Sequence, residues 1–339
     1  MAPLVSAPGA TGRVVTVTGE VDPAALGLTA TSVHLVSDLN DDGDAEDAKV
    51  TMEALGALAL GLRNRDDRRL TEEIVRPELA DFAALGGGAV VEATGFDLAG
   101  RAPALARLAR ASGVAVVMGC GGRSPARTPE IAGTSAEGIA EGIVRDLRDG
   151  VDGVRAGLIG GIDPLDLERP EDRALAAGVA SAAHRTGAPV LVERAATAAA
   201  THELLDLLSA EGADLGRVAV GDCDGLATDA GALAGLAARG VFLQFDGLGR
   251  LPTVYRETDD QDVAAAVMDL AGRGHAERVL LSPRVARKID LKSYGGGGYG
   301  FVAEQFLPFL RYLGADDALL GTFTTENPRR WLTITGDDR

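Results

Sequence analysis

Cysteine is scarce in this chain of 339 residues, which contains only Cys120 and Cys223. Two cysteines cannot form the disulfide framework that stabilises small secreted domains, so we expect a cytoplasmic protein. We expect both thiols to behave as small buried apolar groups. The first residues lack the positively charged, apolar pattern of a signal peptide, and no apolar run reaches the length of a membrane span.

Basic residues are also few. The 33 Lys and Arg are outnumbered by 50 Asp and Glu, and the formal net charge is −17. Nucleic acids and anionic membranes attract proteins through a basic face. The charge balance therefore argues against both kinds of partner and favours a small polar or cationic ligand.

Apolar residues, in contrast, make up 46% of the chain, and they recur in short runs that alternate with Ala- and Leu-rich helical segments. The predicted strands are Thr29–Leu35, Ala89–Thr94, Val114–Gly119, Ala156–Ile162, Pro189–Glu193, Arg217–Gly221, Val241–Phe245 and Arg278–Ser282. The predicted helices include Arg101–Ala111, Pro129–Arg148, Pro170–Thr186, Ala200–Glu211, Ala230–Arg239 and Asp259–Gly272. Eight such alternations favour a parallel (β/α)8 TIM barrel of the α/β class, with a doubly wound open sheet as the alternative.

The segments around the barrel are expected to be short. Residues 14–18 and 19–21 predict a small hairpin, which makes a short N-terminal β extension. We expect residues 1–12 to be a flexible N-terminus, residues 13–334 to form one barrel domain, and residues 335–339 to be a tail. Within this domain, Phe301–Ile334 is predicted to be a closing helix followed by a short final segment.

The stretch 278–300 is the most informative part of the chain. It combines a strand-like apolar run with a polar tip at Ser282-Pro283-Arg284 and a glycine run at 295–298. A β/α barrel builds its pocket from the residues that follow the carboxyl ends of its strands. Arg284 is therefore expected to point into the pocket.

Several short segments resemble a known family in their order and spacing. They are Leu26-Gly27-Leu28-Thr29, Arg155 to Gly160, Arg217 to Gly221, Phe245-Asp246-Gly247, Leu280-Leu281-Ser282, Lys288, Leu291-Lys292, Tyr294-Gly295-Gly296, Gly298-Tyr299 and Asn327-Pro328. Together they resemble the phosphotriesterase family of the amidohydrolase superfamily over roughly residues 13–334. The resemblance implies a (β/α)8 barrel with its active site at the C-terminal ends of the strands, and a homodimer.

The resemblance also implies a pair of divalent metals, but most of the positions that would bind them are changed. The family's ligands are His-x-His on strand one, Lys or Glu on strand four, His on strands five and six, and Asp on strand eight. Only His34 matches. The other positions hold Ser32, Gly160 with Gly161, Glu193, Asp222 and Arg284, with Pro283 at the last position if the alignment moves by one residue.

Histidine is too scarce for a paired zinc-type centre, which needs several neutral imidazoles and a bridging group. The chain has four His, and of these only His34 lies at the pocket end of a predicted strand. Arg284 would also place a permanent positive charge at a cation position, and two like charges about 4 Å apart repel by about 4 kcal/mol at an intermediate dielectric. We therefore predict no binuclear metal centre.

The substituted residues suggest acid–base chemistry. His34, Glu193 and Asp222 are predicted to be catalytic, because paired carboxylates separate their pKa values and an imidazole can move a proton. Arg284 can bind a carboxylate or phosphate of the substrate through two hydrogen bonds. Further predicted substrate contacts are Ser32, Arg123, Asp163, Asp246 and Tyr299.

These residues predict an enzyme that needs no cofactor and acts on a small polar molecule by hydrolysis, elimination, or cyclisation or rearrangement. Two alternatives remain open. One is a non-catalytic ligand-binding barrel, in which Arg284 forms ion pairs with Glu193 or Asp222. The other is a hydrolase with one divalent metal at His34, Glu193 and Asp222, since one imidazole and two carboxylates suit Mn, Fe or Mg.

An acidic loop follows the first predicted strand. Residues 38–44 resemble a calcium loop, with oxygen-bearing side chains at alternating positions and Gly43 for the turn. The twelfth position is Lys49 rather than Glu, so the pattern is incomplete. A solvated acidic loop is the favoured interpretation.

Overall fold

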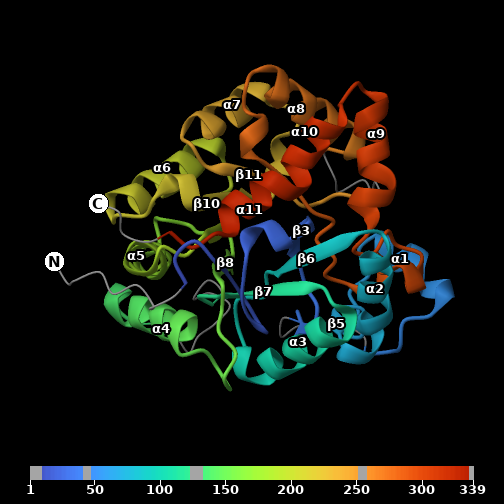
Figure 1. Cartoon of the computed structure of the whole chain (residues 1–339), viewed down its shortest axis with the longest axis horizontal. Helices are drawn as coiled ribbons and strands as arrows, with labels where there is room; N and C mark the ends of the chain where they lie inside the picture. The colour runs from blue at the N-terminus through green and yellow to red at the C-terminus, as the bar shows by residue number, and fades with distance from the viewer. Residues whose placement is uncertain (1–9, 41–46, 123–132, 251–257, 336–339) are drawn as a thin grey trace.

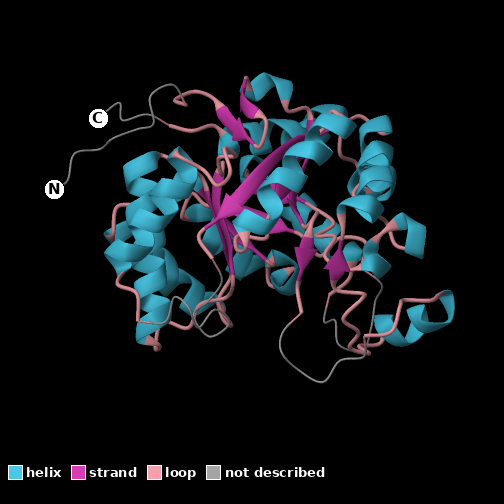
Figure 2. Cartoon of the chain, turned by 90° about the horizontal axis from the view of Figure 1, so that it is seen from below, coloured by secondary structure: helices cyan, strands magenta, loops and turns pink. Residues whose placement is uncertain are grey.

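The predicted barrel is confirmed. The computed structural model describes residues 10–40, 47–122, 133–250 and 258–335. Eight parallel strands form one sheet with the order β12-β11-β10-β9-β8-β7-β6-β3, and helices surround it (Figures 1 and 2). The strands are β3 (Leu28–Val33), β6 (Gly87–Glu92), β7 (Ala115–Cys120), β8 (Leu158–Ile162), β9 (Val190–Glu193), β10 (Val218–Gly221), β11 (Phe242–Phe245) and β12 (Val279–Leu281).

Side-chain hydroxyls help to close the barrel between its first and last strands. The Ser282 hydroxyl donates to the carbonyl oxygen of Ser32 at 2.6 Å and accepts from the backbone N–H of Ser32 at 3.0 Å. The hydroxyl of Thr31 donates to the carbonyl oxygen of Leu281 at 3.2 Å. These bonds satisfy backbone groups where the strands meet, because a buried polar group without a partner is costly.

The helices that follow the strands agree with the predicted pattern. They are α2 (Glu72–Ala84), α3 (Leu98–Ser112), α4 (Ala136–Arg148), α5 (Pro170–Thr186), α6 (Ala198–Ala210), α7 (Ala230–Ala238) and α8 (Asp260–Gly272). Helix α8 begins with a capping box in which the Asp259 side chain accepts from the backbone N–H of Asp262. Helix α2 was absent from the predicted set, and Pro77 interrupts its sequence pattern. Helix α4 begins at Ala136 rather than 129; residues 129–132 lie outside the described part.

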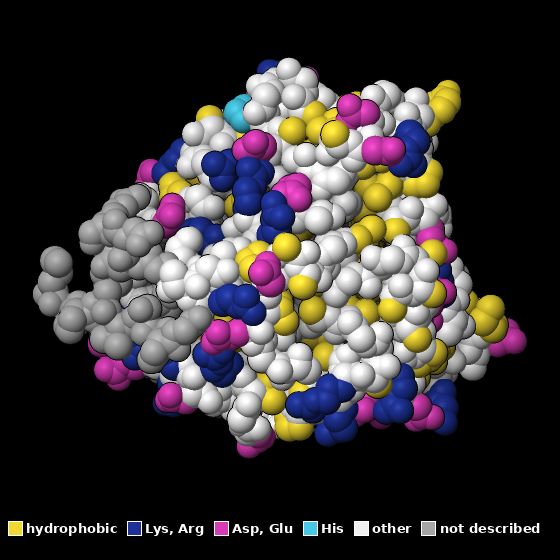
Figure 3. Space-filling model, viewed as in Figure 1, with side chains coloured by type: hydrophobic (Ala, Val, Ile, Leu, Met, Phe, Trp, Pro, Cys, Tyr) yellow, Lys and Arg dark blue, Asp and Glu magenta, His cyan; other side chains and the backbone are white. Residues whose placement is uncertain are grey.

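The N-terminal end of the barrel is plugged. The predicted hairpin is present as antiparallel β1 (Val14–Thr16) and β2 (Gly19–Val21). Val14 packs with Trp331 and Leu332 against inward-facing strand residues such as Val91 and Leu280. Figure 3 views the molecule from the side where α11 (Asn327–Leu332) lies in front in Figure 1, and acidic and basic side chains are interspersed on that face. Packing at this end serves stability rather than chemistry, since barrel active sites lie at the opposite end.

The C-terminal part differs from the prediction of one helix and a short final segment. Two helical runs follow β12: a π-helical turn at Val302–Phe306 continues into α9 (Leu307–Tyr312), and α10 (Asp317–Gly321) continues through a second π-helical turn (Thr322–Glu326) into α11. The second run provides the barrel plug. Near the termini, Gly12 donates its backbone N–H to the carbonyl oxygen of Ile334 at 2.9 Å.

Short elements decorate the C-terminal end of the barrel. Strand β4 (Ser37–Asp38) pairs antiparallel with β5 (Arg69–Leu70), and α1 (Leu55–Ala59) lies between them in the chain. The calcium-like loop begins here, but residues 41–44 lie outside the described part, and the Asp38 carboxylate accepts from Arg69 Nε at 3.1 Å. None of the helices in the described ranges is long and apolar enough to cross a membrane.

Candidate active site at the open end of the barrel

A large cavity opens at the C-terminal ends of the strands. Its volume is about 1160 Å³. Five of the predicted site residues line it: His34, Asp163, Glu193, Asp222 and Arg284. The barrel thus brings together residues that are as much as 250 positions apart in the sequence, because each follows or ends a parallel strand.

His34 lies at the tip of β3 and is held from several directions. Its backbone N–H donates to the carbonyl oxygen of Val285 at 2.8 Å, and its carbonyl oxygen accepts from the Tyr299 hydroxyl at 2.8 Å. The imidazole Nδ1 lies 2.6 Å from Thr94 Oγ1, and the Thr94 hydroxyl donates to Glu92 Oε1 at 2.5 Å. The imidazole is therefore fixed in orientation by a short chain of hydrogen bonds.

A buried arginine pairs with Glu92, the last residue in this series of hydrogen bonds. Arg101, on α3, forms an ion pair with Glu92, and their side chains are 5% and 0% exposed. Arg101 Nη1 also donates to the carbonyl oxygens of Thr94 at 2.6 Å and Phe96 at 2.7 Å. Fully buried charges persist only when they are paired and hydrogen-bonded, and this pair meets both conditions.

Arg284 directly precedes Val285, the backbone partner of His34, and its side chain reaches toward the ends of β9 and β11. Its guanidinium forms an ion pair with Glu193 at the end of β9, and its Nε lies 3.5 Å from Asp246 Oδ2 after β11. Burial lowers the pKa of Arg284 to about 10, while Asp163 acts in the opposite direction, so the group remains charged at neutral pH. Its backbone adopts a φ of 41°, in the left-handed region that is uncommon for residues other than glycine.

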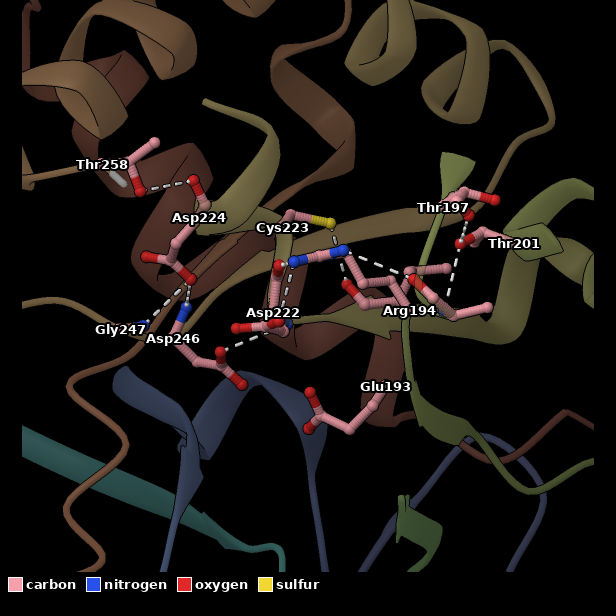
Figure 4. A network of polar contacts seen from close by, with 12 residues as sticks. Glu193, Arg194, Thr197, Thr201, Asp222, Cys223, Asp224, Asp246, Gly247 and Thr258 are labelled. Carbon is pink, nitrogen blue, oxygen red and sulfur yellow. Dashed lines mark hydrogen bonds and ion pairs between the residues drawn. The ribbon is translucent and has the colours of Figure 1, made fainter. Parts of the chain in front are cut away.

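Asp222 has a different arginine partner. Its carboxylate lies 3.2 Å from Arg194 Nη2, and its carbonyl oxygen accepts from Arg194 Nε at 2.8 Å. Figure 4 shows Asp222 within a chain of contacts that runs from Asp224 through Asp246, with Glu193 outside that chain. The side chain of Asp222 is 44% exposed and that of Glu193 is 10% exposed, so Asp222 has the greater access to solvent.

Three carboxylates lie close together beside Arg284. Within the described ranges, Asp222, Asp224 and Asp246 are the one group of three His, Cys, Asp or Glu residues whose ligand atoms lie within 4.8 Å of one another. Asp224 Oδ2 accepts from the backbone N–H groups of Asp246 at 2.9 Å and Gly247 at 3.0 Å. Burial, and then the charges of Asp224 and Asp222, raise the pKa of Asp246 well above its usual range.

The family's two-metal centre does not fit these residues. A guanidinium paired with Glu193 stands where strand eight would offer an acid. On strand four, Gly160 and Gly161 stand where the bridging side chain belongs, and neither has a side chain; at Gly160, which has a φ of 152°, an added Cβ would fall 2.6 Å from the carbonyl oxygen of Leu191. The predicted one-metal set of His34, Glu193 and Asp222 lines one cavity but is not among the groups within ligand distance.

Several predicted substrate contacts are placed away from the cavity lining. Ser32, Asp246 and Tyr299 are buried, with exposures of 1%, 0% and 1%, and none lines the cavity. Asp246 borders Arg284, and Tyr299 supports the backbone of His34, so direct contact of these three residues with a substrate stays a prediction. Arg123 lies outside the described residues. Both cysteines are free and buried, as expected.

The chain of Glu92, Thr94 and Arg101 was missed in the sequence. One signal was available: Glu92 is an acid at the end of an otherwise apolar strand, Gly87–Glu92. An acidic residue at such a buried position needs a cationic partner or hydrogen-bond donors. The identity of those partners depended on the register of neighbouring strands and on the placement of α3.

Comparisons with known proteins agree with the geometry. The model of the phosphotriesterase family matches residues 12–332. The chain is similar to the N-acetyltaurine hydrolase of Bos taurus, with 27% identity over 95% of this chain and 98% of the relative. Among solved structures, it is similar to a resiniferatoxin-binding protein from Rhodobacter sphaeroides, with 34% identity, a TM-score of 0.89, and coverage of 99% of this chain and 100% of the other. It is also similar to a phosphotriesterase homology protein from Escherichia coli with phosphate in its active site, with 27% identity, a TM-score of 0.78, and coverage of 92% and 100%.

Proposed function

The chain belongs to the phosphotriesterase family, and from this premise we propose that it hydrolyses an ester, lactone or amide bond of a small polar molecule by metal-independent acid–base chemistry. The observation that carries the proposal is the placement of Arg284. A fixed cation, held by Glu193, shares one cavity with His34 and Asp222. That cavity therefore offers a site for negative charge and groups that can move protons.

The contacts suggest a division of roles. Arg284 binds an anionic group of the substrate or the oxyanion that develops at the attacked carbonyl. Glu193 holds the guanidinium in place through their ion pair. His34 takes the proton of the attacking water, and Asp222, the more exposed carboxylate, passes a proton from solvent to the leaving group.

The names of the relatives support the class of substrate. N-acetyltaurine, named for the relative from Bos taurus, combines an amide bond with an anionic sulfonate. The homologue from Escherichia coli holds phosphate, also an anion, in its active site. An arginine suits planar or tetrahedral oxyanions because its donors lie in a fixed fork. We therefore propose an anionic N-acyl compound, ester or lactone as the substrate.

The test is a hydrolysis assay in the presence of a chelator. The probes are N-acetyltaurine, other N-acyl amino acids, and simple esters and lactones. With an active probe, Asp222→Asn should lower kcat by about 100-fold or more, because acid–base groups contribute that much. Glu193→Gln should also lower kcat, because the guanidinium of Arg284 loses the carboxylate that holds it in place. Asp206→Asn, at an exposed carboxylate on α6, is the matched control and should leave kcat unchanged. Full activity in both site variants would overturn the proposed roles.

A non-catalytic ligand-binding barrel is the second candidate. The name of the similar structure from Rhodobacter sphaeroides refers to binding, and the pairing of Arg284 with Glu193 leaves these charges balanced without a ligand. This candidate predicts that a molecule binds in the cavity and is recovered unchanged. Turnover of the same molecule by the wild-type protein, lost in Asp222→Asn, would exclude it.

A further inference from the structure

The hydroxyl of Thr94 lies between two groups that compete for its single proton. On one side Thr94 Oγ1 is 2.5 Å from Glu92 Oε1, and on the other it is 2.6 Å from His34 Nδ1. An ionised carboxylate can only accept a hydrogen bond, whereas a neutral imidazole nitrogen can donate or accept. If Glu92 is ionised, the threonine must donate to Glu92 and accept from the imidazole.

The neighbours of Glu92 are a cation and hydrogen-bond donors, so its carboxyl oxygens act as acceptors. Its ion-pair partner Arg101 is charged at any ordinary pH, and the backbone N–H of Leu35 also points to Glu92 Oε1 at 3.4 Å. Arg101 cannot turn away easily, because it is also bonded to the carbonyl oxygens of Thr94 and Phe96. Glu92 and Arg101 therefore determine the direction in which the Thr94 hydroxyl donates.

The geometry assigns Thr94 as a positioning residue that holds His34 in the tautomer with the proton on Nδ1, and it assigns Glu92 as the residue that orients the Thr94 hydroxyl. Nε2 then carries the lone pair of the neutral ring. The backbone of His34 is anchored separately through Val285 and Tyr299, so Thr94 acts on the ring itself. Neither Glu92 nor Thr94 lines the cavity, and both act through His34.

This assignment deepens the proposed function, on which its catalytic use rests. A histidine with its lone pair on Nε2 is ready to accept a proton from water or from the substrate. After accepting it, the ring still donates from Nδ1 to Thr94, so the supporting hydrogen bonds need not rearrange. Preorganised partners of this kind lower the cost of forming charge during a reaction.

The test reads the tautomer directly and needs no substrate. The chain has four histidines, so the ring nitrogens can be labelled with ¹⁵N and His34 assigned by comparison with His34→Gln. In the folded wild-type protein, at a pH where the ring is neutral, Nδ1 should have the chemical shift of a protonated nitrogen and Nε2 that of an unprotonated one. The opposite pattern in the wild-type protein would overturn the assignment.

Variants separate this role from a purely structural one. Thr94→Val keeps the shape of the side chain and removes the hydroxyl, so His34 should shift toward the Nε2-protonated form, and Thr94→Ser should restore the wild-type pattern. Thr324→Val, which changes another buried threonine on the far C-terminal helical run, is the matched control and should have no effect on His34. An unchanged tautomer in folded Thr94→Val would contradict the assignment.

An active substrate adds a kinetic measurement. Thr94→Val should then lower kcat by about 10-fold or more with little change in KM, and Thr94→Ser should recover most of the loss. The two proposals fail independently of each other. The absence of turnover with every probe would count against the proposed hydrolysis and leave the tautomer measurement valid. A wrong tautomer with undiminished turnover would remove only the role of Thr94.

Discussion

Two ion pairs of glutamate and arginine lie at the site, and they differ in how far they are buried. The side chains of the first pair, Glu92 and Arg101, are 0% and 5% exposed. Neither residue lines the cavity, whereas the neighbouring His34 does. The side chains of the second pair, Glu193 and Arg284, are 10% and 19% exposed, and both residues line the cavity. In our proposals the first pair orients the His34 ring, whereas the second pair presents charge to a ligand. The proposals thus connect the burial of each ion pair with its role as support or as a binding group.

Removing the arginine from each pair should give the largest effect and should separate the two pairs. Arg101→Met leaves Glu92 buried without its cation and removes two donors to backbone carbonyls, so the free energy of unfolding should fall by about 3–5 kcal/mol. Arg284→Met should cost less, about 1–2 kcal/mol, because Glu193 keeps some access to water and Asp246 can hold a proton.

Urea denaturation of both variants measures this difference. Arg76→Met provides the control, since Arg76 forms an exposed pair with Glu72 within α2 and should contribute about 0.5 kcal/mol or less. A loss for Arg284→Met equal to or above that for Arg101→Met would remove the distinction between a supporting pair and a binding pair.

The dependence of stability on pH should come from the Arg284 side. Burial raises the pKa of Asp246 in the folded protein, so the folded state holds this proton more tightly than the unfolded chain. Its contribution is therefore most favourable below the unfolded pKa of about 4 and is lost as pH rises toward the folded pKa. Asp246→Asn, which resembles the protonated form, should remove about 1–3 kcal/mol of that decline.

Thermal or urea unfolding between pH 4 and 8 tests this expectation. Asp206→Asn, at an exposed site on α6, should leave the profile as in the wild type. The expectation fails if wild-type stability, compared with that of Asp246→Asn, increases over this range.

The smallest expected effect concerns the support of His34 from the C-terminal loop. Tyr299→Phe removes the hydroxyl that donates to the carbonyl oxygen of His34 at 2.8 Å, and it should lower the free energy of unfolding by about 1 kcal/mol. The tautomer of His34 should not change, because Thr94 remains. Tyr312→Phe, at a residue that is 85% exposed, is the control. A changed tautomer in Tyr299→Phe would mean that the backbone anchor, rather than Thr94, orients the ring.

The sequence predicted the barrel and one half of the site. Strands in a parallel barrel are buried on both faces, so runs such as Val279–Leu281 stand out as short apolar segments. Residues that follow these runs must meet at one end of the barrel, which is why His34, Glu193, Asp222 and Arg284 could be placed together in advance. Their pairing was predicted in part: Arg284 pairs with Glu193, as one alternative expected, but the ion pair of Asp222 with Arg194 was not predicted.

The contacts of Thr94 and Tyr299 with His34 could not be predicted from the sequence pattern, because they depend on how separate elements pack together. Thr94 and His34 follow the ends of β6 and β3, two strands whose pairing is irregular between Ala30 and Val33, and their side chains meet there. Tyr299 was expected in the cavity, yet the course of the loop after the glycine run buries its ring and directs its hydroxyl to a backbone oxygen. Interactions between side chains of different elements are determined by packing and not by local sequence preference.

The metal content of the active protein is the most direct test of the central claim, that a guanidinium has replaced a bound cation in this cavity. The protein should be purified without chelators and analysed by inductively coupled plasma mass spectrometry, and its turnover should be measured before and after treatment with a chelator. Our account predicts well below one transition metal per chain and unchanged turnover. One or two metals per chain, with turnover lost on chelation and restored by the metal, would contradict it.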